Sequence, residues 1–163
     1  MSIQLNGRMD EQASLVQATS MVALTGAPGK GVYISMKNYR RLTVIIDILN
    51  GATVTGTAVT AKQATAVAGT GEKALGFSRM LSNIDYAAAP AMAETAVVSN
   101  TFTTDTTNGK RLRYVLEIDS EDLDSNNGFD CVSIQGASAV NSTGLITYVL
   151  WGARFNGASP FVD

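Results

Sequence analysis

The sequence predicts an all-β fold, which is an antiparallel β-sandwich or a jelly-roll-like barrel with extended termini and at most one or two short helices. Roughly seven to nine strand-sized segments rich in Val, Ile and Thr alternate with turn clusters of Gly, Asn, Asp and Ser. Several segments alternate apolar and polar residues, as half-buried strands do. No long segment has helical periodicity, and no repeat of about 20–50 residues indicates a solenoid or a propeller.

The chain divides into three parts. Residues 1–31 form an N-terminal arm or a short helix, and the helix would cover residues 10–19. Residues 32–155 form the β-domain, and residues 156–163 form a C-terminal tail. A length of 163 residues suits one such domain.

The strands of the β-domain are expected in order along the chain. They are predicted at residues 32–36, 41–49, 52–67, 96–104, 110–119, 129–135 and 145–155, and residues 73–81 fit a strand or a short helix equally well. Asn50 and Gly51 predict a hairpin that joins the second and third of these strands. Gly56 indicates a bulge or a close backbone approach. Gly69 and Gly71 mark a turn.

Two segments between the strands have helical features. Pro90 limits residues 87–93 to a loop or a first helical turn. Ser120 is the predicted cap of a single helical turn at residues 120–123.

Alternation and spacing also predict which side chains are buried. In the segment 110–119 one face carries the apolar residues Leu112, Tyr114, Leu116 and Ile118. Tyr148 and Trp151 are three residues apart, so they lie on opposite faces of their strand. Cys131 is expected in the core, because free cysteine is among the most buried residue types. Asp47 interrupts an apolar strand and is expected to pair with a nearby arginine.

Composition excludes several classes of function. The chain contains no His, which removes His-based catalysis and His metal ligands. The 12 basic and 14 acidic residues give a net charge of −2, so we expect no nucleic-acid partner. No apolar run reaches the roughly 18–20 residues of a membrane span, and the N-terminus lacks a signal-peptide pattern. We therefore expect no membrane association.

Two motifs resemble binding loops but depart from their patterns. Residues 26–31 place only two residues between Gly26 and Gly29, and Gly31 stands where a phosphate loop needs Ser or Thr. Residues 122–128 place Gly128 one position too late for an EF-hand loop. The acidic loop is therefore either solvated or a calcium site of another kind, with candidate ligands Asp119, Asp122, Asp124 and Asn126. We predict no catalytic residue, no cofactor and no metal.

Two basic clusters are candidate partner contacts, and both stand at strand starts. They consist of Arg40 with Arg41, and of Arg111 with Arg113. Basic residues there either solvate a sheet edge or bind an acidic partner surface.

The tail supplies further candidate contacts. Pro160 disfavours regular strand pairing, and Phe161 and Val162 are apolar anchors that a free monomer would leave in water. The low charged fraction of 16% and the many small residues also suit close packing against another protein.

One long stretch carries a resemblance to a known group. Residues 33–75, YISMKNYRRLTVIIDILNGATVTGTAVTAKQATAVAGTGEKAL, resemble a pattern in small virion proteins of tailed bacteriophages, and RLRYVLEID followed by FDCVSIQG resembles their C-terminal half. The resemblance is greatest to capsid decoration (cement) proteins. It implies a jelly-roll or related β-fold and a symmetric oligomer, a dimer or a trimer. It also implies the major capsid protein as partner and a place on the outer capsid surface after assembly in the host cytoplasm.

These observations support three functional hypotheses, none of them enzymatic. The first is a decoration protein that binds and stabilises the capsid shell. The second is a structural component of a phage tail or baseplate. The third is a carbohydrate-binding β-sandwich that uses Trp151 or Tyr148 together with the acidic loop.

Overall fold

The computed structural model describes residues 13–18, 22–23, 31–97, 99–137, 139–153 and 160–162. Within these residues the chain forms two antiparallel sheets packed face to face, which confirms the predicted all-β sandwich. The helical elements of this part of the chain are the single 3₁₀ turns η1 (Ser120–Asp122) and η2 (Ser125–Asn127).

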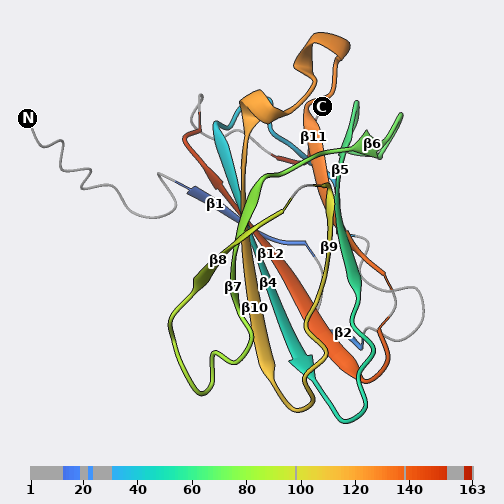
Figure 1. Cartoon of the computed structure of the whole chain (residues 1–163). Coiled ribbons are helices and arrows are strands. Elements are labelled where there is room, and N and C mark those ends of the chain that lie inside the picture. The colour runs from blue at the N-terminus through green and yellow to red at the C-terminus, as the bar shows by residue number, and fades with distance from the viewer. Residues whose placement is uncertain are drawn as a thin grey trace, which may run out of the picture.

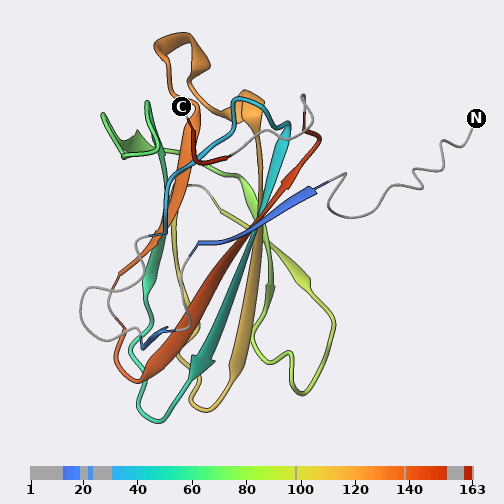
Figure 2. The same cartoon turned by 180° about the vertical axis from the view of Figure 1, so that it is seen from behind.

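The larger sheet, sheet A, has the strand order β1-β12-β4-β10-β7-β8, and β2 also pairs with β12. Its strands are β1 (Ala13–Gln17), β2 (Val22–Ala23), β4 (Arg41–Asn50), β7 (Arg79–Asn83), β8 (Ala93–Ala96), β10 (Arg111–Asp119) and β12 (Ser142–Trp151). The long strands β4, β10 and β12 run side by side through the middle of Figure 1, and β8 lies at one side of the molecule in both views (Figures 1 and 2).

The smaller sheet, sheet B, has the order β3-β11-β5-β6, and β9 also pairs with β5. Its strands are β3 (Ile34–Ser35), β5 (Ala58–Ala64), β6 (Lys73–Ala74), β9 (Thr101–Thr103) and β11 (Cys131–Gly136).

The core lies between the sheets and comes mainly from alternate residues of the long strands. The predicted inward face of β10 is confirmed, because its apolar residues at 112, 114, 116 and 118 are all buried. The inward residues of β4 are Leu42, Val44, Ile46 and Ile48, which are also buried. Cys131 is fully buried, as expected, but it belongs to a small separate cluster with Tyr33 and Ala64 and not to the core between the sheets.

Tyr148 links the two sheets inside the core. Its side chain is fully buried, and its hydroxyl accepts a hydrogen bond from the backbone N–H of Ile134 in β11 at 2.8 Å. Burial raises the pKa of this hydroxyl, so it stays protonated. Gly31 leaves the space for this contact, since a Cβ there would lie 2.6 Å from the tyrosine oxygen and 2.5 Å from the carbonyl oxygen of Ile134.

The hairpin predicted at Asn50 and Gly51 is wrong. β4 pairs with β10 and β12, whereas the next strand, β5, belongs to sheet B, so the chain crosses between the sheets here. The buried Asn50 side chain instead donates to the carbonyl oxygens of Asp105 and Thr107, each at 3.0 Å. This asparagine holds a distant loop and does not shape a two-residue turn.

The alternative of a short helix at residues 10–19 is also wrong for residues 13–17, because these form the strand β1 and pair with β12. The remaining residues of 10–19, apart from Ala18, lie outside the described residues. The cap of the turn at 120–122 is Asp119 and not Ser120, and its side chain accepts from the turn's backbone.

Several predicted strands have other bounds or are divided. The segment 32–36 is a strand only at β3, and the strand predicted at 145–155 begins earlier, at Ser142, and ends at Trp151. The segment 52–67 is a strand only at β5, and Gly56 before it makes the predicted close approach, with its Cβ position 2.6 Å from the carbonyl oxygen of Thr104. The segment 73–81 divides into β6 and the start of β7, and residues 96–104 divide between β8 and β9 in different sheets. Gly69 and Gly71 have positive φ, as the predicted turn requires.

Candidate functional site

The main candidate is the outer face of sheet A, the side that points away from sheet B. Alternation along the three central strands and their register place one set of residues on it. They are Arg41, Thr43, Ile45, Asp47 and Leu49 of β4, Arg111, Arg113, Val115, Glu117 and Asp119 of β10, and Thr143, Leu145, Thr147, Val149 and Trp151 of β12.

Aliphatic side chains form a band across the middle of this face. Val115 pairs with Ile45 on one side and with Leu81 of β7 on the other, and all three are half-buried. In the neighbouring row Val149 pairs with Leu15 of β1, which is 62% exposed. Antiparallel sheets that face water usually carry polar residues there, so this band indicates a surface suited to a protein partner.

Ion pairs flank the aliphatic band. The guanidinium of Arg113 donates to both carboxylate oxygens of Asp47, at 2.6 and 3.0 Å, which confirms the predicted pairing of that aspartate. Nε of Arg41 donates to Asp119 at 2.8 Å. Each acidic partner raises the pKa of its arginine, so both guanidinium groups stay charged. Paired charges at the rim orient a partner more than they add affinity.

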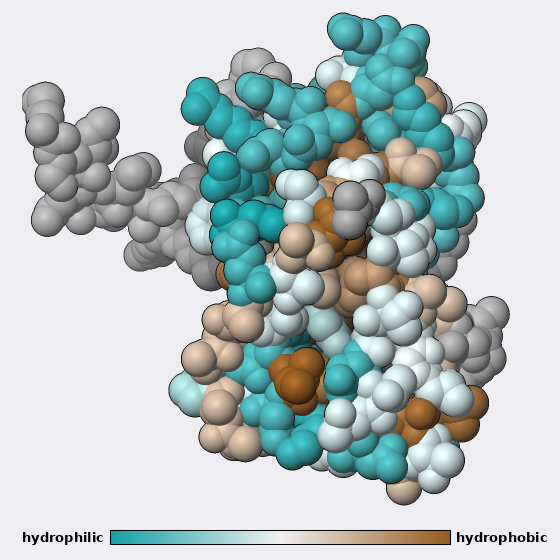
Figure 3. All heavy atoms as spheres, viewed as in Figure 1, coloured by the Kyte–Doolittle hydropathy of each residue, from teal (hydrophilic) through white to brown (hydrophobic). Residues whose placement is uncertain are grey.

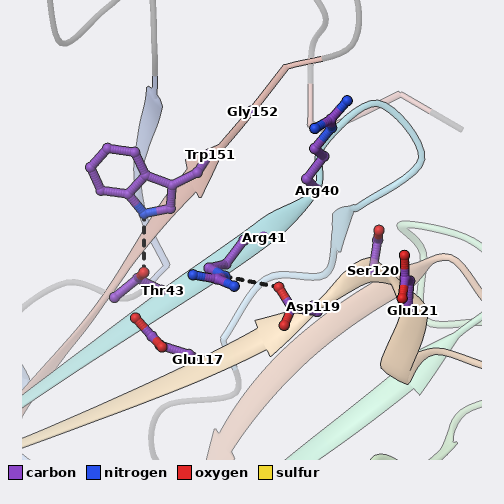
Figure 4. Close-up of a pocket in the computed structure, with 9 residues that line it drawn as sticks. All are labelled: Arg40, Arg41, Thr43, Glu117, Asp119, Ser120, Glu121, Trp151 and Gly152. Atoms are coloured by element: carbon purple, nitrogen blue, oxygen red, sulfur yellow. Dashed lines mark hydrogen bonds and ion pairs between the residues drawn. The ribbon is translucent and has the colours of Figure 1, made fainter. Parts of the chain in front are cut away.

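An open groove of about 980 Å³ lies at the end of this face where β4 begins and β10 and β12 end. Figure 4 shows its lining, in which Arg41 and Asp119 point toward one another. The lining residues are Arg40, Arg41, Thr43, Glu117, Asp119, Ser120, Glu121, Trp151 and Gly152.

Trp151 forms one wall of the groove. Its indole N–H donates to the hydroxyl of Thr43 at 3.0 Å, which fixes the ring beside the sheet, and the residue is 38% exposed. Tyr148 points into the core, so the predicted opposite faces are confirmed. A buried Tyr148 cannot stack on a sugar, which corrects its inclusion in the carbohydrate hypothesis.

Three of the four predicted arginines lie in strands of sheet A, and Arg40 lies directly before β4. Arg40 and Arg41 line the groove, whereas Arg111 and Arg113 lie toward the opposite end of the outer face, opposite Leu49 and Asp47 of β4.

The predicted tail contacts lie elsewhere. Pro160 is buried, and its carbonyl oxygen accepts from the N–H of Ser35 in β3 at 2.7 Å, at the edge of sheet B. Pro160 therefore contacts the chain's own β3, and its role as a partner contact stays a prediction. Phe161 and Val162 are 50% and 63% exposed.

The carboxylates of the acidic loop are engaged by donors of the chain itself. Asp119 accepts from Arg41, and Asp122 accepts from the backbone N–H of Asp119. Asp124 is paired with Lys73 and accepts from Asn127, and these contacts lower its pKa. Across the described ranges, no group of three or more His, Cys, Asp or Glu is placed to hold a metal ion.

Sheet B carries a polar cluster on its outer face. The hydroxyl of Tyr33 donates to one carboxylate oxygen of Glu72 at 2.7 Å, and Lys62 donates to the other at 2.5 Å. These donors lower the pKa of Glu72 to about 2. This face presents hydrogen-bonded polar groups, in contrast to the aliphatic band of sheet A.

Sequence reasoning missed the aliphatic contribution of Ile45, Leu81 and Leu15. A signal was present, since residues 42–46 are apolar at nearly every position, which indicates a strand that is apolar on both faces. The position of Leu15 depends on the pairing of β1 with β12, which no local pattern specifies.

Comparison with known proteins gives one structural similarity. No family model matches the chain, and no curated protein matches its sequence. The crystal structure of SPBc2 prophage-derived protein YomS is similar, with 14% identity over 86% of this chain and 93% of that chain and a TM-score of 0.46. That neighbour is thus a prophage-derived protein, and a likeness of this degree carries no argument about function. No helix in the described part of the chain has the length and hydropathy needed to cross a bilayer.

Proposed function

We propose that this chain is a structural virion protein of a tailed bacteriophage that binds the capsid shell as a decoration protein. In this proposal it attaches through the outer face of sheet A, acts without chemistry of its own, and is placed on the outer capsid surface after assembly in the host cytoplasm. The phage assignment rests on the resemblance carried by residues 33–75.

The observation that carries the binding role is the aliphatic band flanked by ion pairs. Interfaces place apolar residues at the centre and charged residues at the rim, and Ile45 and Val115 between the pairs of Asp47 and Asp119 follow that arrangement. Many copies on one shell would multiply a modest contact through avidity. The many small residues allow close approach to a neighbouring subunit.

Co-sedimentation with undecorated shells of the phage that encodes the chain tests the proposal. We expect the chain to pellet with the shells and to raise their heat resistance. Val115→Lys places a charge in the middle of the band and is expected to weaken binding at least about tenfold, as loss of a central contact does. Thr60→Lys on the outer face of sheet B is the matched control and should bind normally.

Two outcomes would contradict the proposal. The chain fails to pellet with shells, or Val115→Lys and Thr60→Lys bind as the parent does while circular dichroism shows all three folded. Parallel sedimentation with purified tails addresses the tail or baseplate alternative, since binding to tails and not to shells would favour it.

A carbohydrate-binding role is the second candidate, and the exposed indole beside the polar groove favours it. Aromatic rings next to hydrogen-bonding side chains are suited to bind sugars, and Arg41 and Glu117 line the same groove as Trp151. A glycan array with the parent chain and with Trp151→Ala tests this role. Binding that the substitution abolishes would support it, and an array without binding would exclude the glycans displayed.

A further inference from the structure

β8 is an edge strand in the described part of sheet A, and β7 is its neighbour on one side only. All four of its residues, Ala93–Ala96, are exposed, whereas buried residues alternate with more exposed ones along the central strand β4. Figure 3 shows pale, weakly hydrophobic residues over the hairpin that joins β7 and β8 at the lower left, and Figure 1 shows β8 on the outside of that hairpin. Unpaired edge strands template pairing with another chain unless charge, proline or a bulge prevents it.

The register of the β7–β8 pair identifies which backbone groups are free. The N–H of Val97 donates to the carbonyl oxygen of Ser78 at 3.0 Å, in line with the pairs Thr95↔Met80 and Ala93↔Ser82. Because backbone groups alternate in direction along a strand, the N–H and C=O of Glu94 and Ala96 point away from β7.

We propose that β8 pairs antiparallel with β8 of a second copy across a twofold axis at Thr95. In this register Glu94 of each copy faces Ala96 of the other, so the free N–H and C=O groups of both residues are paired. Thr95 then faces its own counterpart in a pair without hydrogen bonds. The interface is symmetric and closed, as twofold dimers require.

Charge complementarity supports this register over its neighbours. Glu94 and Arg79 lie on the same outer face, 3.7 Å apart within one chain, with both side chains more than half exposed. Arg79 is the β7 partner of Ala96, so each Glu94 would meet Arg79 of the second copy across the methyl group of that copy's Ala96. Strand spacing makes this a distance of about 10 Å between backbones, which these two long side chains span. A register with Glu94 opposite Glu94 would instead place like charges together.

The dimer stands independently of the proposed function, but it has a consequence for it. Strands paired in one continuous sheet keep their faces aligned, so both outer faces of sheet A would point the same way. A dimer could then contact one shell with two faces at once.

A disulfide trap tests the dimer in the full chain. Facing residues in a pair without hydrogen bonds have Cα atoms about 4.5 Å apart, within the range of a disulfide. We expect Thr95→Cys to form a covalent dimer under mild oxidation. Ala96→Cys, in the same exposed strand, should remain monomeric, because its counterpart lies two positions away along the paired strands, and the roughly 7–8 Å between such diagonal neighbours is too far for a disulfide. The native Cys131 is fully buried and does not compete.

Further variants test the pairing of the backbone and the charges. Ala96→Pro removes an N–H that points to the free edge, so the hydrogen bonds between β7 and β8 persist. When this change is added to Thr95→Cys, the amount of covalent dimer should fall at least tenfold. Arg79→Glu and Glu94→Arg should each weaken dimer formation in sedimentation velocity, and the double exchange should restore it. Equal cross-linking of Thr95→Cys and Ala96→Cys, or none by either, would overturn the proposal. Shell binding by a monomeric chain would overturn the dimer alone, and a dimer without shell binding would count only against the proposed function.

Discussion

Replacing Tyr148 by Phe tests whether the link between the two sheets stabilises the sandwich. The change removes one oxygen from a fully buried ring and leaves the ring itself in place. The backbone N–H of Ile134 then loses its acceptor inside the core. A buried donor without a partner costs about 1–3 kcal/mol, so we expect a loss of that size in the free energy of unfolding.

Urea unfolding followed by circular dichroism measures this loss as a lower midpoint with an unchanged slope. For a domain of this size each kcal/mol corresponds to about 2–4 °C, so the melting temperature should fall by about 2–12 °C. Tyr114→Phe is the matched control, because its hydroxyl accepts from the N–H of Asp105 at 2.8 Å nearer the surface, where water can replace it. The reasoning is refuted if Tyr148→Phe loses no more than Tyr114→Phe.

Three further predictions concern other parts of the sandwich. The pKa of Glu72 is lowered in the folded chain, so the contribution of this carboxylate to stability is present above about pH 4.5 and is lost as pH falls toward about 2. The difference in unfolding free energy between the parent and Glu72→Gln should therefore shrink between these two pH values, as unfolding measured at several pH values will show. Asp47→Asn should cost about 0.5–1 kcal/mol, because the pair with Arg113 is partly exposed; a double-mutant cycle with Arg113→Met that finds no coupling would contradict this. Asn83 donates to the carbonyl oxygens of Ala89 and Ala91, each at 2.7 Å, and so holds the loop between β7 and β8. Asn83→Ala should therefore lower the free energy of unfolding by about 1–3 kcal/mol and increase proteolysis within residues 84–92. An unchanged cleavage pattern would count against this role of Asn83 in holding the loop.

Local pattern was enough to predict the long strands and the inward face of β10. In β10 strict alternation marked the buried side chains, and the odd spacing of Tyr148 and Trp151 placed one inside and one outside. These assignments depend only on the two-residue period of a strand. The pair of Asp47 was predictable because a charge within an apolar strand needs a partner.

Pairing between distant segments was beyond local pattern. Asn50 and Gly51 carry the residues of a tight hairpin, yet Asn50 is buried and bonds to the loop at 105–107, so tertiary contacts override the turn preference. The groove likewise depends on the register that sets Trp151 beside Arg41 and Arg41 beside Asp119. Of the groove's lining residues, Arg40, Arg41, Asp119, Ser120 and Trp151 were singled out from the sequence, but for separate reasons and not as parts of one groove.

The position of β12 has a consequence for how the protein is made. Of the described strands it is synthesised last, yet it is inserted between β1 and β4, which leave the ribosome much earlier. Until β12 emerges, the long apolar β4 presents one side without a neighbour, a state that invites association between nascent chains. Completion of the larger sheet must therefore wait until β12 has left the ribosome, and chains that terminate before β12 should be recovered as aggregates and not as smaller folded products.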